Sequence, residues 1–197
     1  MDLLQGIRTR RSIGKVKPDP VERHLVEQLL EAATLAPNHF LTEPWRFFVM
    51  TGEGRNVLAN AYTEIALEQV GNMGNLSEEE IGRIREQQTA KAFRAPLVIA
   101  VAAELREDAE WKKKEDLAAV HAAVQNLLLA AHGMNLGAIW RSGEPLYHPK
   151  MLEAFGLKPP AEMVGVIYIG YPDMTPLPPK RTPFGEKTVW LGWDERV

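Results

Sequence analysis

Cysteine is absent from the 197 residues of this chain. Its absence excludes disulfide bonds, thiolate metal ligands and cysteine nucleophiles. No apolar run approaches the roughly 20 residues that a membrane-spanning helix needs. The N-terminal stretch MDLLQGIRTRR also lacks the long apolar core of a signal peptide. We therefore expect a cytoplasmic protein with no membrane partner.

A basic excess and the common catalytic motifs are absent too. The formal net charge of -3 and the pI near 6.0 do not indicate a nucleic-acid binder. The five histidines show no spacing typical of metal ligands, so no metal site is predicted. The phosphate-loop, zinc-protease and serine-hydrolase motifs do not occur. Gly52 and Gly54 imitate part of a dinucleotide fingerprint, but Val57 stands where its third glycine belongs, and we interpret the segment as a tight turn.

Hydrophobic residues make up 45% of the sequence, enough for one substantial core, and we expect a single domain over residues 1–197. Runs rich in β-branched and aromatic residues alternate with segments of helical periodicity. Strands are predicted at 45–51, 97–103, 137–140 and 163–170, and helices from residue 3 to the arginines and near 20–36, 57–66, 77–90, 116–133 and 149–156. Because long helical segments separate the strands, the class is α+β or α/β, with helices flanking a sheet.

Two helix boundaries are predicted from local signals. Asp19 as N-cap, Pro20 at the first helical position and Glu22 three residues after the cap indicate that the second helix starts at Pro20. The stretch WKKKED, residues 111–116, is interpreted as a solvated connection before the very apolar helix at 116–133. A helix that is apolar on several sides lies in the centre of a core or of an interface.

Residues 171–197 differ in character from the rest of the chain. Five prolines lie between Pro172 and Pro183, and two tryptophans, Trp190 and Trp193, follow them. Proline-rich chain cannot pair as a central strand and tends to run extended over a surface. Each tryptophan has a large apolar area to bury. We therefore predict an extended C-terminal arm that docks on a second copy of the subunit.

Three polar segments are candidates for ligand binding. The stretch RTRRSIGKVKPDP at 8–20 carries five cations, which fit either a helix C-terminus or a bound anion. The Trp140–Ser142 segment lies at the end of a predicted strand, and RSGEP, residues 141–145, is interpreted as the exit loop of that strand. The arginine and serine suit a phosphate, and Trp140 beside Arg141 suits an aromatic ligand. Trp140 could equally be core and Arg141 a surface ion-pair partner. His39 lies in a loop between two prolines, where its side chain is free to face a ligand.

Four motifs in order give these candidates a common interpretation: TRRS, APNHFLTEPWRFFV, FRAPLVIAV and GAIWRSG. From Leu3 to about Gly170 the chain resembles the nitroreductase family of FMN-dependent oxidoreductases, in particular its small, near-minimal branch. The resemblance implies an α+β fold, a three-layer α/β/α sandwich in an intertwined homodimer with FMN at the subunit interface. It also implies ping-pong hydride transfer from NAD(P)H to small acceptors such as nitroaromatics or quinones.

The resemblance also assigns residues. No catalytic side chain is implied, since the flavin carries the chemistry. FMN contacts are implied for Arg10, Arg11, Ser12, Lys15, Leu35, His39, Trp140, Arg141, Ser142 and Arg181, and nicotinamide-nucleotide contacts for Ala130, Ala131, His132, Gly133, Met134 and Asn135. The His39 contact would come from the partner subunit, and that of Leu35 from its backbone.

The chain departs from the family pattern at Glu43, where the family often has glutamine. A carboxylate there would disfavour an anionic substrate or the reduced flavin, unless it points away and caps a backbone amide, which is our interpretation. Two other activities stay open on the same fold. One is a flavoprotein with different chemistry, such as reductive dehalogenation or flavin destruction, and the other is a flavin-binding protein without turnover.

Overall fold

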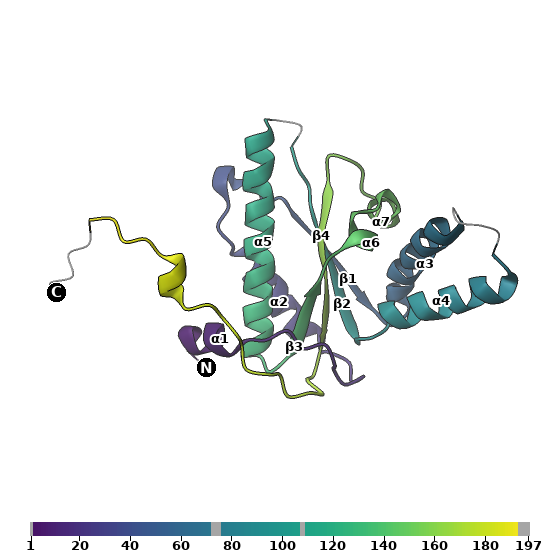
Figure 1. The fold of residues 1–197 in the computed structure, drawn as a ribbon, viewed down its shortest axis with the longest axis horizontal. Helices are drawn as coiled ribbons and strands as arrows, with labels where there is room; N and C mark the ends of the chain where they lie inside the picture. The colour runs from purple at the N-terminus through teal and green to yellow at the C-terminus, as the bar shows by residue number, and fades with distance from the viewer. Residues whose placement is uncertain (1, 72–75, 107–108, 193–197) are drawn as a thin grey trace.

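A four-stranded antiparallel sheet with the order β1-β2-β4-β3 forms the centre of the molecule (Figure 1). The computed structural model describes residues 2–71, 76–106 and 109–192. The strands are β1 (Trp45–Thr51), β2 (Leu97–Ala103), β3 (Gly137–Arg141) and β4 (Glu162–Gly170). All four predicted strands are confirmed, each within one residue at either end.

The central strand β2 explains the layered architecture. Every residue of LVIAVAA is buried, and successive side chains point to opposite faces of the sheet. Leu97, Ile99 and Val101 join the core on one face, while Val98 and Ala100 join a second core on the other. A continuous apolar run is what a strand with two covered faces requires.

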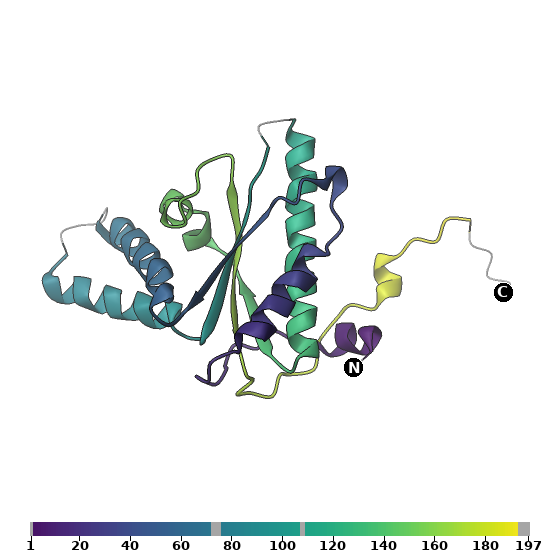
Figure 2. The ribbon, with the colours of Figure 1, turned by 180° about the vertical axis from the view of Figure 1, so that it is seen from behind.

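Helices α2 (Arg23–Thr34) and α5 (Glu110–Gly133) cover the first face and pack against each other (Figure 2). The side chains of Val120, Val124 and Leu127 are fully buried between α2 and the sheet. With 24 residues, α5 is about 36 Å long and spans the whole height of the sheet.

Helices α3 (Asn56–Gly71), α6 (Glu144–Tyr147) and α7 (Pro149–Ala154) cover the second face, and α4 (Glu78–Ala92) packs on α3. Ser77 and Glu80 form a capping box at the start of α4. Helices therefore lie on both sides of one sheet, which confirms the three-layer sandwich of the α+β class.

Three expectations about helices are wrong. Helix α2 starts at Arg23 with Glu22 as its N-cap, because Val21 is buried and the Glu22 carboxylate accepts a hydrogen bond from the Tyr171 hydroxyl at 2.6 Å. The charged stretch WKKKED belongs to the first turns of α5, where the lysine stems can lie along the helix surface. The predicted exit loop after Arg141 contains the short helix α6.

An N-terminal strap, defined as residues 10–17, runs from α1 (Leu3–Thr9) past the end of β3 to β4. The backbone N–H of Ile13 donates to the carbonyl of Ala138 at 3.0 Å, and that of Lys17 donates to Tyr171 at 2.8 Å. Gly137 makes this approach possible, because a β-carbon there would lie 2.7 Å from a methyl group of Ile13. The strap is thus fixed beside the sheet by backbone bonds.

After β4 the C-terminal arm runs away from the domain, as Figure 1 shows. One short 3-10 helix, η3 (Phe184–Lys187), interrupts its extended backbone. The side chains of Val189, Trp190 and Leu191 are 80%, 60% and 89% exposed, while Trp193 lies outside the described residues. None of the described helices combines the length and the apolarity needed to cross a bilayer.

The loop that carries His39 is strained and is held by one buried carboxylate. Phe40, Leu41 and Glu43 have positive φ, which is uncommon for residues other than glycine. Asp116 of α5, 1% exposed, accepts hydrogen bonds from Thr42 at 2.8 Å and from Arg106 at 3.0 and 3.2 Å. The carboxylate therefore ties the loop to the first turns of α5.

Replacing Asp116 with alanine should lower the free energy of unfolding by about 3 kcal/mol, the low end for a broken buried pair, because Arg106 still reaches water. Urea denaturation followed by circular dichroism measures this. Asp173→Ala is the control, because Asp173 pairs with Lys15 on the surface and its loss should change stability little. Equal effects of both variants would contradict the assigned role of Asp116.

Candidate functional site

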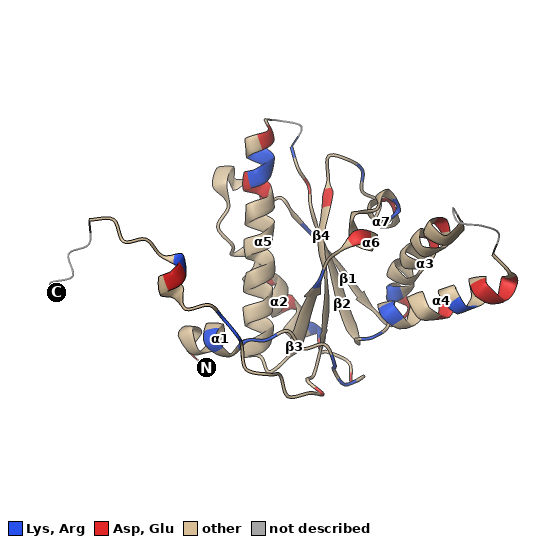
Figure 3. Cartoon of the chain, viewed as in Figure 1, with Lys and Arg blue, Asp and Glu red and all other residues tan. Residues whose placement is uncertain are grey.

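Three arginines meet at the lower end of α5, where the strap and the C-terminal arm pass each other (Figure 3). Arg10 caps α1, with its backbone N–H donating to Gly6 at 2.9 Å, and Arg11 follows in the strap. Burial, and then the charges of Arg11 and Arg181, hold the pKa of Arg10 below its ordinary value. None of the three arginines forms a salt bridge with a described carboxylate, so the positive charge of the cluster is uncompensated.

His132, in the last turn of α5, adjoins this arginine cluster. Its Nε2 lies 2.8 Å from the Thr9 hydroxyl. Burial, together with the charges of Arg10 and Arg11, holds the pKa of His132 below its ordinary value. A group of guanidinium donors without a counter-ion is chemically suited to a phosphate dianion. The donor set of this structure therefore fits the phosphate end of FMN.

The other strap residues continue from the arginine cluster past the N-terminal end of β3 toward the end of β4. Ser12 is exposed on the strap, next to the Ile13–Ala138 backbone bond. The Lys15 ammonium pairs with Asp173 at 2.7 Å, so a carboxylate already balances its charge. Unlike Lys15, the side chains of Arg10, Arg11 and Arg181 pair with no carboxylate among the described residues.

Trp140 lies at the end of β3 and is held by its neighbours. Its indole N–H donates to the carbonyl of Val164 at 3.2 Å, and its ring lies 5.7 Å from that of His121. The pairing of β2 with β4 shifts by one residue between Val101 and Ala102, where Val164 is the extra residue. The half-buried indole thus anchors the strand end from which Arg141 and Ser142 emerge.

Arg141 and Ser142 line a cavity of about 270 Å³ on the face of the sheet covered by α3 and α6. Two cations from the end of α4, Lys91 and Arg94, and two tyrosines, Tyr62 and Tyr168, also line it. Lys91 and Arg94 border a further hollow beside Gly14 of the strap. The strap therefore connects the arginine cluster with this second polar site.

His39 lies at the opposite end of α5 from the arginine cluster, and Leu35 directly follows the last residue of α2. The His39 ring nitrogen Nδ1 is 3.4 Å from the carboxylate of Glu115 in the first turns of α5, whereas His132 is in its last turn. The 17 residues between Glu115 and His132 correspond to about 25 Å along the helix. Within one chain, His39 and Arg10 cannot contact the same small ligand.

The family model for the nitroreductase family matches residues 7–171. The chain belongs to the nitroreductase family. It is 35% identical over 182 residues to YfhC of Bacillus subtilis (strain 168), a candidate NAD(P)H nitroreductase by name, and the match covers 92% of this chain and 90% of YfhC.

Two solved structures are similar over nearly the whole length of this nitroreductase. The nitroreductase-like family protein from Bacillus cereus has a TM-score of 0.84 and 32% identity, with 98% and 97% of the two chains covered. A nitroreductase candidate from Desulfovibrio desulfuricans, crystallised in complex with FMN, has a TM-score of 0.71 and 27% identity over 98% and 99%. The three-layer fold is therefore the fold of the family.

The segment assigned to the nicotinamide nucleotide forms the C-terminal end of α5 in this nitroreductase. Ala131 is fully buried, and its carbonyl accepts the N–H of Leu136 at 2.8 Å. Asn135 takes a positive φ of 60° where the helix ends. His132, Gly133 and Asn135 have surface to offer a ligand, while Ala131 has none.

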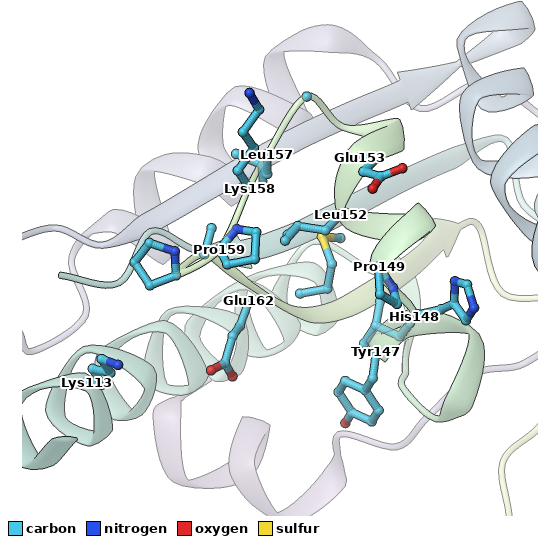
Figure 4. Close-up of a pocket in the computed structure, with 15 residues that line it drawn as sticks. Lys113, Tyr147, His148, Pro149, Leu152, Glu153, Leu157, Lys158, Pro159 and Glu162 are labelled. Carbon is cyan, nitrogen blue, oxygen red and sulfur yellow. The ribbon is translucent and has the colours of Figure 1, made fainter. Parts of the chain in front are cut away.

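A larger cavity, of about 970 Å³, lies between the start of α5 and the α6–α7 region (Figure 4). Leu146, Leu152 and Met163 contribute apolar surface to it, and Lys113 and Glu162 flank it with opposite charges. None of the site residues predicted from the sequence lines this cavity, and we assign it no part in the site. The Glu43 side chain is exposed and caps no backbone amide among the described residues.

Sequence reasoning missed Tyr62, Lys91, Arg94 and Tyr168 as site residues. Arg94 lies in the motif FRAPLVIAV, which contributed to the family resemblance and predicted a strand but assigned no role to Arg94. Tyr62 and Lys91 lie on two helices whose polar residues resemble any solvated surface. The sequence signal for this cavity is weak, because its residues come from four separate elements.

Gly165 is the position that makes room for the Trp140 indole. A β-carbon at residue 165 would overlap the indole nitrogen. Gly165→Ala should therefore displace Trp140 and destabilise the fold by about 1–3 kcal/mol. Gly82→Ala is the matched control, because a β-carbon at Gly82 in α4 meets nothing within 4 Å and should stabilise the helix by about 1 kcal/mol. Urea unfolding compares the two variants, and a stable Gly165→Ala protein would show that Trp140 has another resting position.

Proposed function

We propose that this protein is a cytoplasmic, homodimeric FMN-dependent oxidoreductase that uses NAD(P)H to reduce nitroaromatics, quinones or related acceptors by ping-pong hydride transfer. The observation that carries the proposal is the uncompensated positive charge of Arg10, Arg11 and Arg181 in a nitroreductase-family chain. Guanidinium groups that have no carboxylate partner are suited to bind an anion such as the phosphate of FMN.

The phosphate of FMN would be held by the arginine cluster and Ser12. Arg141 and Ser142, at the far end of β3 from the strap, would meet the ring system. When bound, the flavin supplies the hydride acceptor and donor of the reaction. The guanidinium of Arg141, which pairs with no described carboxylate, would stabilise negative charge on the reduced ring. Lys15 would contribute less, because Asp173 balances its charge.

A two-fold axis that runs two α5 helices antiparallel would complete the site. It would bring the His39 loop of the partner subunit to the Arg10 end of this chain, with Leu35 contributing its backbone. The strained backbone of that loop supports a binding role, since strain of this kind clusters at ligand sites. The exposed side chains of Val189, Trp190 and Leu191 favour an arm that docks on the same partner.

The nicotinamide donor would approach at the C-terminal end of α5. His132, Gly133 and Asn135 would contact it, with Ala130 and Met134 at the side and Ala131 supporting the helix end from within. The positive charge of Arg10 and Arg11 beside this segment would offset the negative end of the helix dipole, which by itself disfavours a phosphate.

Arg10→Ala should weaken FMN binding about tenfold or more, because a charge-assisted hydrogen bond contributes roughly 1.5–3 kcal/mol. Flavin content after gel filtration and titration of apoprotein with FMN measure the loss. Arg8→Ala is the matched control, since Arg8 is exposed in α1 and should leave binding unchanged. An Arg10→Ala protein that stays fully loaded would contradict the phosphate role.

The reaction itself is tested on the wild-type holoenzyme. NADH or NADPH should bleach the flavin absorption anaerobically, and a nitroaromatic or a quinone should restore it. A spectrum that is lost and does not return would indicate flavin destruction instead. A loaded protein that neither nucleotide bleaches would indicate a flavin-binding protein without turnover, and a colourless protein that takes up no FMN would remove the proposal.

Truncation after Met174 should convert the dimer into monomers, because the arm would carry much of the apolar area that the partner covers. The cut keeps the Lys15–Asp173 pair and the Val16–Pro172 bridge, so the strap stays anchored. Light scattering over a range of concentrations measures the mass. Arg181→Ala in the full chain is the control: it should lose FMN and remain dimeric. A truncated protein with the mass of a dimer would place the interface elsewhere.

A further inference from the structure

The cavity of about 270 Å³ beyond Arg141 contains a set of groups that the proposed phosphate and ring contacts leave unused. Polar groups from four elements converge there: Tyr62 of α3, Lys91 and Arg94 at the end of α4, Arg141 and Ser142 at the end of β3, and Tyr168 of β4. Pro145, Leu146 and Val166 supply apolar walls. None of the described residues that line the cavity carries a carboxylate.

The two tyrosines place hydroxyl groups in the interior. Tyr62 and Tyr168 are 6% and 3% exposed, and their Oη atoms are 3.3 Å apart. Burial raises the pKa of both phenols, so both keep their protons at neutral pH. When one hydroxyl donates to the other, the second still has a proton to donate. The cavity thus holds a buried, protonated donor.

Three cations surround the phenols. The Lys91 ammonium lies 4.2 Å from the centre of the Tyr62 ring, and the Arg94 guanidinium carbon lies 5.2 Å from that of Tyr168. Burial and the charge of Arg94 lower the pKa of Lys91. Within the described chain, neither these two side chains nor Arg141 forms a salt bridge. Positive charge therefore gathers beside the two buried hydroxyls without a counter-ion among the described residues.

We propose that this cavity binds the carboxylate of an aromatic acceptor, so that the enzyme prefers anionic aromatic acceptors to neutral ones. This inference rests on the proposed function, because it names the acceptor class of the same site. The buried phenol and the guanidinium groups match a planar oxyanion, and the apolar walls match a ring. Arg141 and Ser142 belong both to this cavity and to the proposed ring contacts, so an acceptor held here would lie next to the flavin.

The holoenzyme is tested with 4-nitrobenzoate and its neutral analogue 4-nitrobenzamide. Arg94→Gln should lower kcat/KM for 4-nitrobenzoate about tenfold, as the loss of a charged hydrogen bond implies, and change that for the amide less than about twofold. Arg85→Gln removes the same charge from an exposed position of α4 and should change neither value. Equal losses for both acceptors, or equal effects of the two variants, would overturn the proposal.

The phenols are tested separately with Tyr168→Phe, which keeps the ring under Arg94 and removes one hydroxyl. It should lower kcat/KM for 4-nitrobenzoate more than for the amide. Tyr147→Phe is the matched control, since Tyr147 is 65% exposed and lines the other cavity. A selectivity that Tyr168→Phe leaves unchanged would overturn the part assigned to the buried hydroxyls.

Binding without turnover separates this inference from the proposed function. Benzoate titrated into the purified protein should release or absorb heat in calorimetry, benzamide should bind more weakly, and Arg94→Gln should abolish the difference. This result is expected even if NAD(P)H fails to reduce the protein. Absence of benzoate binding would overturn the inference. An Arg94→Gln variant whose only defect is lost FMN would also overturn it, because that result would assign these cations to the cofactor.

Discussion

The length of α5 is the constraint on which the arrangement of the whole site depends. The helix is apolar enough to lie between α2 and the sheet, and its 24 residues carry it across the full height of the molecule. The His39 loop is bound to its first turns through Asp116 and Arg106, and α1 with Arg10 is bound to its last turn through His132. A rigid helix therefore holds the two groups of residues that we propose as FMN contacts about 25 Å apart. In the proposed dimer, each chain would supply one part of each of two sites, and the exposed arm would cover the partner subunit.

The uncompensated charge in the strap is tolerated because the backbone, and not the side chains, fixes its position. Ile13 and Lys17 pair with β3 and with the end of β4 through main-chain hydrogen bonds, and Gly137 lets them approach. The fold therefore does not depend on the side chains of Arg10, Arg11 and Ser12, and these side chains can face a ligand. Lys15 of the same strap differs from these residues, because its side chain forms a surface ion pair with Asp173.

The strands were predictable because their signals are local. LVIAVAA is a continuous apolar run of strand length, which is typical of a strand covered on both faces. Ser77 with Glu80 marks a helix start without reference to the rest of the chain. The start of α2 was missed because the Glu22 carboxylate is held by Tyr171, 149 positions further along. The arginines of the strap and Arg141 were predicted as FMN contacts from the motifs TRRS and GAIWRSG. The buried pair Tyr62 and Tyr168 was missed because only the fold brings α3 and β4 together.

The cavity lined by Arg141 and Tyr168 also shows how one irregularity in the sheet can position side chains. The extra residue Val164 turns its carbonyl toward the Trp140 indole, and Gly165 gives that ring its space. With the indole on the α5 face, the next side chain along β3 points to the opposite face. Arg141 is thereby directed toward Tyr168, and toward the cations at the end of α4. Because side chains alternate along a strand, anchoring Trp140 on one face of the sheet also places Arg141 on the other face.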